Sequence, residues 1–478
     1  MWRTRICLLL ILVAGLALRI TYVATTGHST FTQSRDGEIA HNIVAHGRWF
    51  VYNERARLYL DAITGRLHRN VDPAEIDYAT LDKGAHFYPE SGESIGSSAV
   101  LAGLWQITGG ERYLPLQILQ AILDALAALL VYRIAMRLFK IRRVALIAAA
   151  LYALYPPIAW LTVVPYNDIW TVDFTIAIVA CYLEALGSEH RWRWLVACGL
   201  LAGVGSYFRP NVLLVAPILA LATIAATGWR EALRRGACVT LISALLVVPW
   251  TVRNYEDFHA FIPGTSSLWE NMWNGLGELP NTFGATLGTH GTYAEVRRVR
   301  PDLRPESPAW DEYLKGWVVS AIEQHPLFYL EILVHRTAVA TIWNHDETWM
   351  HRGVAPLLDY KGGILAFVVN RPFDLLQYAL QPLAFLLAML ALALTWRRRR
   401  AEHLILIAIA LSVLVPYLAI HVEGRYILPA EFVYLIWIGL GADLLLTRVG
   451  ARLRSRSASL STGIRASDRR AARAPGGV

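Results

Sequence analysis

Two carboxylates stand close together shortly after the first apolar run of the chain. They are Asp36 and Glu38, in the segment SRDGEIAHNIVAHGRWF (34–50). Ile39 and Ile43 follow at helical spacing, which predicts a short helix with Asp36 at its N-cap. A cap would give Asp36 only a structural role. A carboxylate beside a substrate hydroxyl could instead accept its proton as a general base, and Glu38 could be a second base or could orient that hydroxyl.

Three arginines favour the chemical role. Arg209 in YFRPN, Arg253 in PWTVRNY and Arg425 in VEGRYILP each stand at one end of a predicted membrane span. Arginine binds phosphate well because its planar guanidinium keeps its charge and donates two parallel hydrogen bonds. Snorkelling toward ordinary lipid headgroups is the structural alternative for each of them. Burial would raise the pKa of Asp36 from its reference value of about 3.9 and nearby arginines would lower it, so the sequence leaves that balance open.

The composition is that of an integral membrane protein. The chain has 478 residues, of which 55% are hydrophobic and only 17% are charged, against about 25% charged in soluble domains. The net charge of +8 is concentrated in the last part of the chain, where eight arginines and one acid follow residue 447. This cationic tail, poor in apolar residues, is predicted to be disordered and cytoplasmic. Nucleic-acid binding is not expected, because no folded basic face accompanies the tail.

Ten apolar runs approach the length of a membrane span, which is about 20 residues. They lie near 6–24, 113–136, 143–161, 167–187, 194–208, 210–227, 235–251, 375–396, 402–420 and 426–447. The run at 97–107 is too short to span and is interpreted as a re-entrant or surface helix. The stretch 326–343 is ambiguous, so the fold class is an all-α polytopic membrane protein with about 10–12 transmembrane helices.

The basic clusters between these runs set the topology. Ten spans place every cluster and both termini in the cytoplasm, and place two long loops on the outer face of the membrane. The chain then divides into a transmembrane module at 1–251 that includes the first outer loop at 25–112, an outer-loop region at 252–374, C-terminal helices at 375–447, and the basic tail at 448–478. Asp36 and the three arginines all lie on the outer face.

The order of these segments resembles a known family. PWTVRNYEDFHAFIPGTSSLWENMWNGLG, RDGEIAHNIVAHGRW, FRPN and EGRYILP are similar to segments of the polyprenyl-phosphate-dependent glycosyltransferases of the GT-C fold. That family includes the aminoarabinose transferases of lipid A and the protein O-mannosyltransferases. The resemblance runs from the first helix to about residue 447.

The resemblance implies a sugar donor carried on a polyprenyl phosphate, with transfer on the periplasmic side of a bacterial inner membrane. The first-loop acid, here Asp36, would accept the acceptor's proton in a single displacement that inverts the anomeric centre. Arg209, Arg253 and Arg425 would bind the donor phosphate. The acceptor would be a hydroxyl of a glycolipid, glycan or protein, the membrane lipids would be neighbours, and no cofactor would be required.

Several other residues have weaker claims to a role. Asp168 in PYND lies where some members of the family place a metal-binding or acceptor-binding acid, although capping of the next helix is the simpler interpretation. Glu90 in YPESGES occupies the place of a Pro-Pro-Leu-like element that is missing here, and Tyr426 adjoins Arg425. The cluster WNHDETWMH (343–351) matches no specific zinc spacing. Several members of the family that the chain resembles work without metal, so none is expected to be required.

Three other functions compete with glycosyl transfer. A transporter or flippase for a lipid-linked glycan would carry polar residues at the midplane of several helices and would often show internal repeats. In this sequence Asp124 is nearly the only polar residue at the midplane of a predicted span. An O-antigen ligase or polymerase would lack an acid so soon after the first helix. A membrane scaffold would not explain arginines clustered on one face. The donor sugar and the acceptor stay open.

Overall fold

Helices make up almost all of the regular structure. The computed structural model describes residues 2–26, 35–49, 51–56, 58–59, 62, 72–341 and 372–471. The cluster WNHDETWMH lies outside the described residues. Within them, five helices are long and apolar enough to cross a membrane: α1 (Trp2–Thr26), α6 (Leu114–Phe139), α13 (Trp229–Phe258), α21 (Arg400–Ile420) and α22 (Gly424–Ala471).

The other predicted apolar runs are helical as well. They form α7 (Arg142–Ala153), α8 (Pro156–Leu161), α9 (Asp168–Ala185), α10 (Arg191–Gly205), η2 (Pro210–Leu214), α11 (Val215–Ala222), α12 (Ile224–Thr227) and α20 (Pro372–Thr395). The run at 143–161 is divided where Pro156 begins α8, and Pro210 begins η2 after the end of α10. Proline has no N–H to donate and disfavours a helical residue before it. The prediction of an all-α membrane protein is confirmed.

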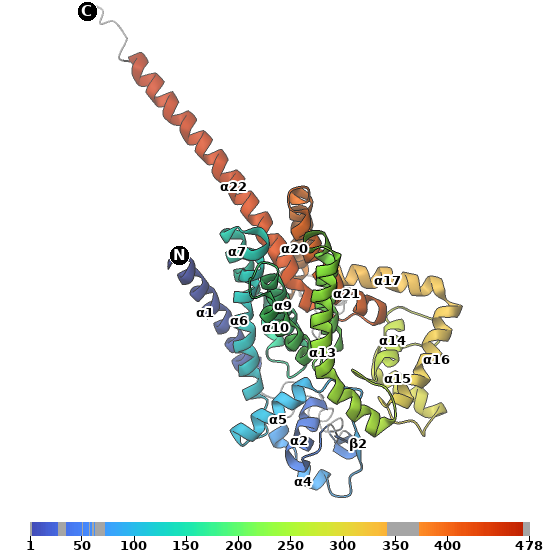
Figure 1. Ribbon diagram of the computed structural model, residues 1–478. Helices are drawn as coiled ribbons and strands as arrows, with labels where there is room; N and C mark the ends of the chain where they lie inside the picture. The colour runs from blue at the N-terminus through green and yellow to red at the C-terminus, as the bar shows by residue number, and fades with distance from the viewer. Residues whose placement is uncertain are drawn as a thin grey trace, which may run out of the picture.

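The first loop forms a small cap on one end of the bundle (Figure 1). Its elements are α2 (Arg35–His46), β1 (Val51–Asn53), η1 (Pro73–Glu75), α4 (Tyr78–Leu81), β2 (Phe87–Pro89) and α5 (Gly96–Thr108). The two strands pair antiparallel, with Val51 opposite Pro89. The run predicted as a re-entrant or surface helix is α5. It packs against α2 through Ile39, Leu101 and Trp105, all of which belong to the main hydrophobic core.

The second loop carries a separate hydrophobic core. It contains α14 (Leu268–Leu276), α15 (Thr289–Val299), α16 (Pro308–Gln324) and α17 (Pro326–Thr341). Trp273, Trp310 and Leu314 are buried together there, and each such side chain contributes about 1.5–3 kcal/mol when it leaves water. The stretch left ambiguous by the sequence is α17, which runs across the direction of the bundle helices (Figure 1).

The N-terminus and the far end of α22 lie at the end of the bundle opposite to α2 and α5 (Figure 1). The predicted disorder from residue 448 is not what the structure shows, because α22 continues as a helix to Ala471. Arginine and alanine, which are frequent there, are strong helix formers. A helix that is already formed also extends without a new nucleation step.

Asp124 forms a buried polar contact between helices. The Arg19 guanidinium Nε lies 2.5 Å from Asp124 Oδ2, and both side chains are fully buried. The Tyr152 hydroxyl donates to the other carboxylate oxygen. Asp124 therefore joins α1, α6 and α7 through Arg19 and Tyr152.

Gly96 permits a close approach that positions Arg209. A Cβ at Gly96 would lie 2.5 Å from the ring of Phe208, which is buried directly before Arg209. We expect Gly96→Ala to lower the free energy of unfolding by about 1–3 kcal/mol through overpacking. Gly103→Ala on the same helix is the control, because a Cβ there meets nothing within 4 Å. Thermal denaturation in detergent would measure both, and an equal midpoint for the two variants would contradict this account.

Candidate active site

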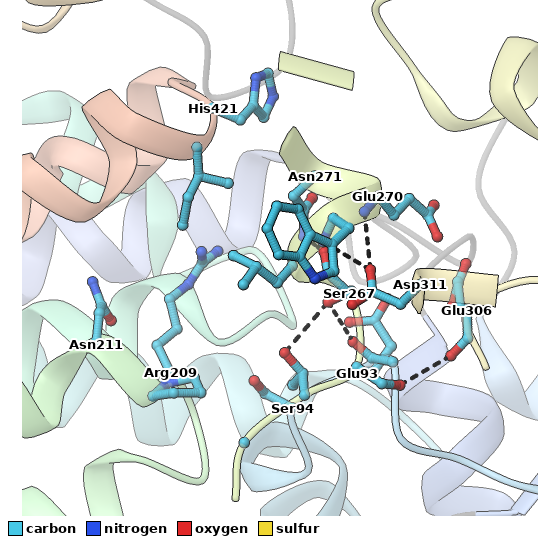
Figure 2. Close-up of a pocket in the computed structure, with 18 of the residues that line it drawn as sticks. Glu93, Ser94, Arg209, Asn211, Ser267, Glu270, Asn271, Glu306, Asp311 and His421 are labelled. Carbon is cyan, nitrogen blue, oxygen red and sulfur yellow. Dashed lines mark hydrogen bonds between the residues drawn. The ribbon is translucent and has the colours of Figure 1, made fainter. Parts of the chain in front are cut away.

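A cavity of about 1220 Å³ lies between the two loops and the end of the bundle. Figure 2 shows Arg209 and His421 reaching it from the bundle side, with Glu270 and Asp311 on the opposite side. The wall is therefore cationic on one side and acidic on the other. Such a cavity is the default location for a substrate site.

The cationic side is built around one shared carboxylate. Asp168 begins α9, Arg209 follows α10, and Arg425 lies in the first turn of α22. The Arg209 guanidinium forms an ion pair with Asp168 Oδ1, and Arg425 Nη1 lies 3.8 Å from Asp168 Oδ2. Three helix ends thus bring together residues that are more than 250 positions apart in the sequence.

Aromatic rings support the two guanidinium groups. The Tyr426 ring centroid lies 4.3 Å from the guanidinium carbon of Arg209 and 4.9 Å from that of Arg425. Tyr417 stacks on Tyr426 with 5.0 Å between ring centroids. Stacking on an aromatic face holds a guanidinium in place while its N–H groups stay available to a ligand. Tyr426 is therefore part of the cationic side.

A chain of charged contacts extends from Arg425 along the cavity wall. Arg425 Nε donates to Glu423 at 2.6 Å, and His421 bridges Glu423 at 3.1 Å and Glu278 at 2.6 Å. Hydrogen bonds to these two carboxylates raise the pKa of His421 to about 9, although burial opposes that shift. The pKa of Glu423 falls to about 2 despite its burial, because Arg425 and His421 stabilise its charge.

The opposite side of the cavity gathers acids. The Asp311 carboxylate accepts from the backbone N–H of Glu270 at 3.0 Å, and burial raises the pKa of both groups. Glu306 forms an ion pair with Arg35. Arg35 also donates to Glu90 at 2.9 Å, so it connects α2 to this side.

Asp36 lies behind the wall between the two sides. Its carboxylate is 5% exposed and accepts a hydrogen bond from Ser98 Oγ at 2.6 Å. Burial, together with the nearby charges of Glu93 and Asp168, raises the pKa of Asp36 to about 8 although the Ser98 hydrogen bond lowers it. Both of those acids line the cavity. Asp36 is the second residue of α2, so it is not the N-cap that its position in the sequence predicts.

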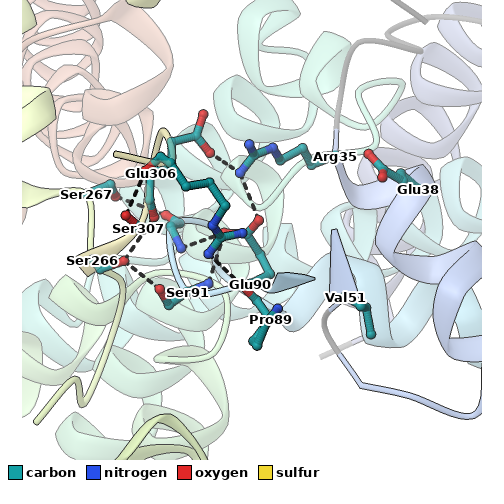
Figure 3. A network of polar contacts seen from close by, with 12 residues as sticks. Arg35, Glu38, Val51, Pro89, Glu90, Ser91, Ser266, Ser267, Glu306 and Ser307 are labelled. Carbon is teal, nitrogen blue, oxygen red and sulfur yellow. Dashed lines mark hydrogen bonds and ion pairs between the residues drawn. The ribbon is translucent and has the colours of Figure 1, made fainter. Parts of the chain in front are cut away.

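Three predicted site residues lie away from the cavity wall. Figure 3 shows Glu38 apart from the contacts among Arg35, Glu90 and Glu306. Glu38 accepts from the Asn53 backbone N–H at 2.7 Å, which holds β1 to α2. Glu90 accepts from the N–H of Gly92 at 2.6 Å. Arg253 donates to the Glu90 carbonyl at 2.7 Å, and it ties α13 to the first loop.

Comparisons with known proteins cover parts of this chain. Residues 93–252 match the family model described as dolichyl-phosphate-mannose-protein mannosyltransferase. An undecaprenyl phosphate-alpha-4-amino-4-deoxy-L-arabinose arabinosyl transferase from Pectobacterium carotovorum is 26% identical over 224 residues, which cover 43% of this chain and 40% of that protein. The protein of the same name from Pseudomonas paraeruginosa is 28% identical over 163 residues, covering 32% and 30%. This chain thus matches less than half the length of these relatives.

A solved structure covers nearly the whole chain. The archaeal oligosaccharyltransferase AglB from Archaeoglobus fulgidus, in complex with an inhibitory peptide and a dolichol-phosphate, aligns with a TM-score of 0.52 at 14% identity. The alignment covers 96% of this chain and 52% of that one. The fold is that of the GT-C-type glycosyltransferases. The resemblance drawn from the sequence motifs is confirmed.

Within this GT-C-type fold, the sequence predicted part of the candidate site. The structure brings Asp168, Arg209, Arg425 and Tyr426 to one wall and places Asp36 behind it. Sequence reasoning missed His421 and Glu423, although both belong to the turn HVEGRY that supplied Arg425. An acid placed between a histidine and an arginine in so short a turn was an available signal. Glu270 and Asp311 gave no such signal, since each lies in the first turn of a helix, where an acid is common.

Proposed function

We propose that this protein transfers a sugar from a polyprenyl-phosphate donor to a hydroxyl of a glycolipid, glycan or protein. One observation carries the proposal. Arg209 and Arg425 share the single carboxylate Asp168 on a cavity wall. The buried Asp36 interacts electrostatically with Asp168 and Glu93 of that wall, and its pKa is raised to about 8. A phosphate site beside a proton acceptor is what glycosyl transfer from a lipid phosphate requires.

The charge balance supports a phosphate ligand on the cationic side. With His421 protonated, the contact network holds four positive and three negative groups: Arg209, Arg336, His421 and Arg425 against Asp168, Glu278 and Glu423. Among the described residues, these seven groups together carry one net positive charge. A polyprenyl-phosphate sugar is a phosphodiester with a single negative charge, so its binding would neutralise the network.

The proposed reaction is a single displacement. The acceptor oxygen attacks the anomeric carbon as its proton passes to the Asp36 carboxylate, and the bond from that carbon to the phosphate oxygen breaks. Its electron pair leaves with the polyprenyl phosphate, which becomes a monoester with one more negative charge. Arg209 and Arg425 would stabilise that new charge in the transition state. Attack opposite to the leaving group inverts the anomeric configuration.

We place this reaction on the outer face of a bacterial inner membrane, with both termini in the cytoplasm. The opposed positions of the first loop and the two described chain ends support this arrangement (Figure 1). The roles proposed for Arg253 and Glu90 are to hold the loops that form the cavity wall, through the hydrogen bond that joins them. No metal ion is proposed to contact the reacting groups.

A transfer assay tests the proposal. The full chain in detergent would receive radiolabelled polyprenyl-phosphate sugars and a membrane lipid extract, without added divalent cations. We expect the label to move to an acceptor and polyprenyl phosphate to be released. In liposomes, a flippase would instead carry the intact donor across the bilayer. Movement of the donor with its sugar–phosphate bond unbroken, and no transfer in any mixture, would overturn the proposal.

The rate of transfer should depend on pH because of Asp36. Its pKa of about 8 means that the proton-accepting form is the minority species at pH 6 and increases with pH. We expect kcat/KM to rise about tenfold per pH unit below pH 8 and to level off above it. Initial rates between pH 6 and pH 9 would measure this profile. A rate that is flat or falls over that range would exclude Asp36 as the titrating base.

A further inference from the structure

A second cluster of polar side chains lies in the first loop, apart from the cavity. His41 and His46 belong to α2, and Asp82 directly follows α4. One ligand atom of each lies within 4.8 Å of the other two. None of the three lines the cavity, so the proposed transfer reaction makes no use of them.

Their geometry fits a divalent metal ion. His46 Nε2 lies 2.7 Å from Asp82 Oδ2, and His41 Nε2 lies 3.7 Å from the same oxygen. Zinc binds such atoms at about 2.0–2.2 Å, so neighbouring ligands of a tetrahedral ion are about 3.4 Å apart. The two distances lie on either side of that value, and small rotations of the side chains would close the site.

The neighbours of the cluster orient its ligands. Glu111 lies 2.9 Å from His41 Nδ1 through either carboxylate oxygen, which favours the tautomer whose Nε2 lone pair is available to a metal. Tyr78 stacks on the His41 ring, with 3.8 Å between centroids. Asn53 donates to Asp82 Oδ1 at 2.6 Å, leaving Oδ2 toward the histidines. A carboxylate behind a histidine ligand is the usual outer shell of a zinc site.

We propose that His41 Nε2, His46 Nε2 and Asp82 Oδ2 bind one divalent transition-metal ion such as Zn²⁺, with water as a fourth ligand. The ion would join the C-terminal half of α2 to the turn after α4. The same helix carries Asp36 near its start, so the metal would fix the helix that positions the proposed base. This inference does not depend on the proposed transfer activity, because its tests count bound metal.

The experiment uses the full chain in detergent with an affinity tag free of histidine. Protein equilibrated with Zn²⁺ and then freed of excess would be analysed by elemental mass spectrometry. We expect one zinc per chain in the wild type, and close to none in His46→Ala and Asp82→Asn. His86→Ala, which removes an exposed histidine of the same loop, should keep its zinc. Wild-type protein without zinc, or equal zinc in all four proteins, would overturn the proposal.

A milder variant separates metal binding from folding. Glu111→Gln keeps all three ligands but weakens the hydrogen bond to His41, so its affinity for Zn²⁺ should fall about 10- to 100-fold. Added Zn²⁺ should raise the thermal midpoint of the chelator-treated wild type, raise that of Glu111→Gln only at higher concentration, and leave that of His46→Ala unchanged. The same zinc-induced rise in His46→Ala would show that any ion binds elsewhere.

Discussion

Replacing Asp36 by asparagine is expected to reduce glycosyl transfer by about 10³-fold while leaving the protein folded. General base catalysis contributes about 10²- to 10⁴-fold, and the amide has no proton-accepting oxygen of comparable basicity. Asparagine keeps the size of the side chain and can still accept the hydrogen bond from Ser98. Initial rates with a radiolabelled polyprenyl-phosphate sugar would measure the loss.

Glu38→Gln is the matched control on the same helix. Its side chain is also buried, and a glutamine oxygen can still accept from the Asn53 N–H, so transfer should stay within a few-fold of wild type. Loss of transfer in Glu38→Gln with full transfer in Asp36→Asn would reverse the assignment of the base. Full transfer in both variants would move the search to Asp168.

The dependence of stability on pH provides a second test of Asp36→Asn. Asp36 has a pKa near 3.8 when unfolded and about 8 when folded. Between these values the folded state holds a proton that the unfolded state has lost, so Asp36 makes stability fall as pH rises. Above about pH 8 both states are ionised, and the destabilisation by Asp36 has reached its full size. Asp36→Asn carries no such charge and should therefore match or exceed the wild-type thermal midpoint at pH 8.

The sequence predicted the elements of the fold well because apolar length and proline positions are local properties. The runs that became α6 and α21 could be located by hydropathy alone, and Pro210 explains the break after Arg209. The tail from residue 448 is the exception to this agreement. Its composition indicates disorder, but its backbone continues a helix that begins at Gly424.

The candidate site was harder to predict because its contacts are not local. Arg209, Arg253 and Arg425 look alike in the sequence, since each ends an apolar run. In the structure only Arg209 and Arg425 meet a common partner, Asp168. Arg253 instead lies over Trp250 and reaches the Glu90 carbonyl. The assembly of the helix ends determines which of these three arginines reaches the cavity. The spacing of residues in the sequence does not predict that assembly.

The pKa of Asp36 illustrates the same limit. The sequence contains both opposing influences, an apolar helix and nearby arginines. The structure shows that the closest arginine, Arg35, pairs with Glu90 and Glu306, while Arg209 pairs with Asp168. Burial therefore dominates and raises the pKa of Asp36. The direction of the shift in the pKa of Asp36 therefore depends on which carboxylates the nearby arginines pair with. The composition of the loop does not reveal that pairing.

Removing the guanidinium of Arg425 is expected to have the second large effect on transfer. Arg425→Ala takes away one of the two described arginines that line the cavity and leaves Glu423 without the partner at 2.6 Å. Loss of one preorganised donor to a developing anion costs about 10²- to 10³-fold in kcat, and weaker donor binding should add to this. Initial rates at several donor concentrations would separate kcat from KM.

Two further arginines make this experiment decisive. Arg297→Ala removes an exposed arginine of α15 and should leave both kcat and KM unchanged. Arg253→Ala tests the distinction that the structure draws, since a residue outside the cavity wall should affect the thermal midpoint more than kcat. If Arg253→Ala and Arg425→Ala lose kcat equally at unchanged stability, the donor phosphate must contact both arginines. The phosphate would then bind nearer to the Glu90 carbonyl, which Arg253 contacts, than to the carboxylate of Asp168.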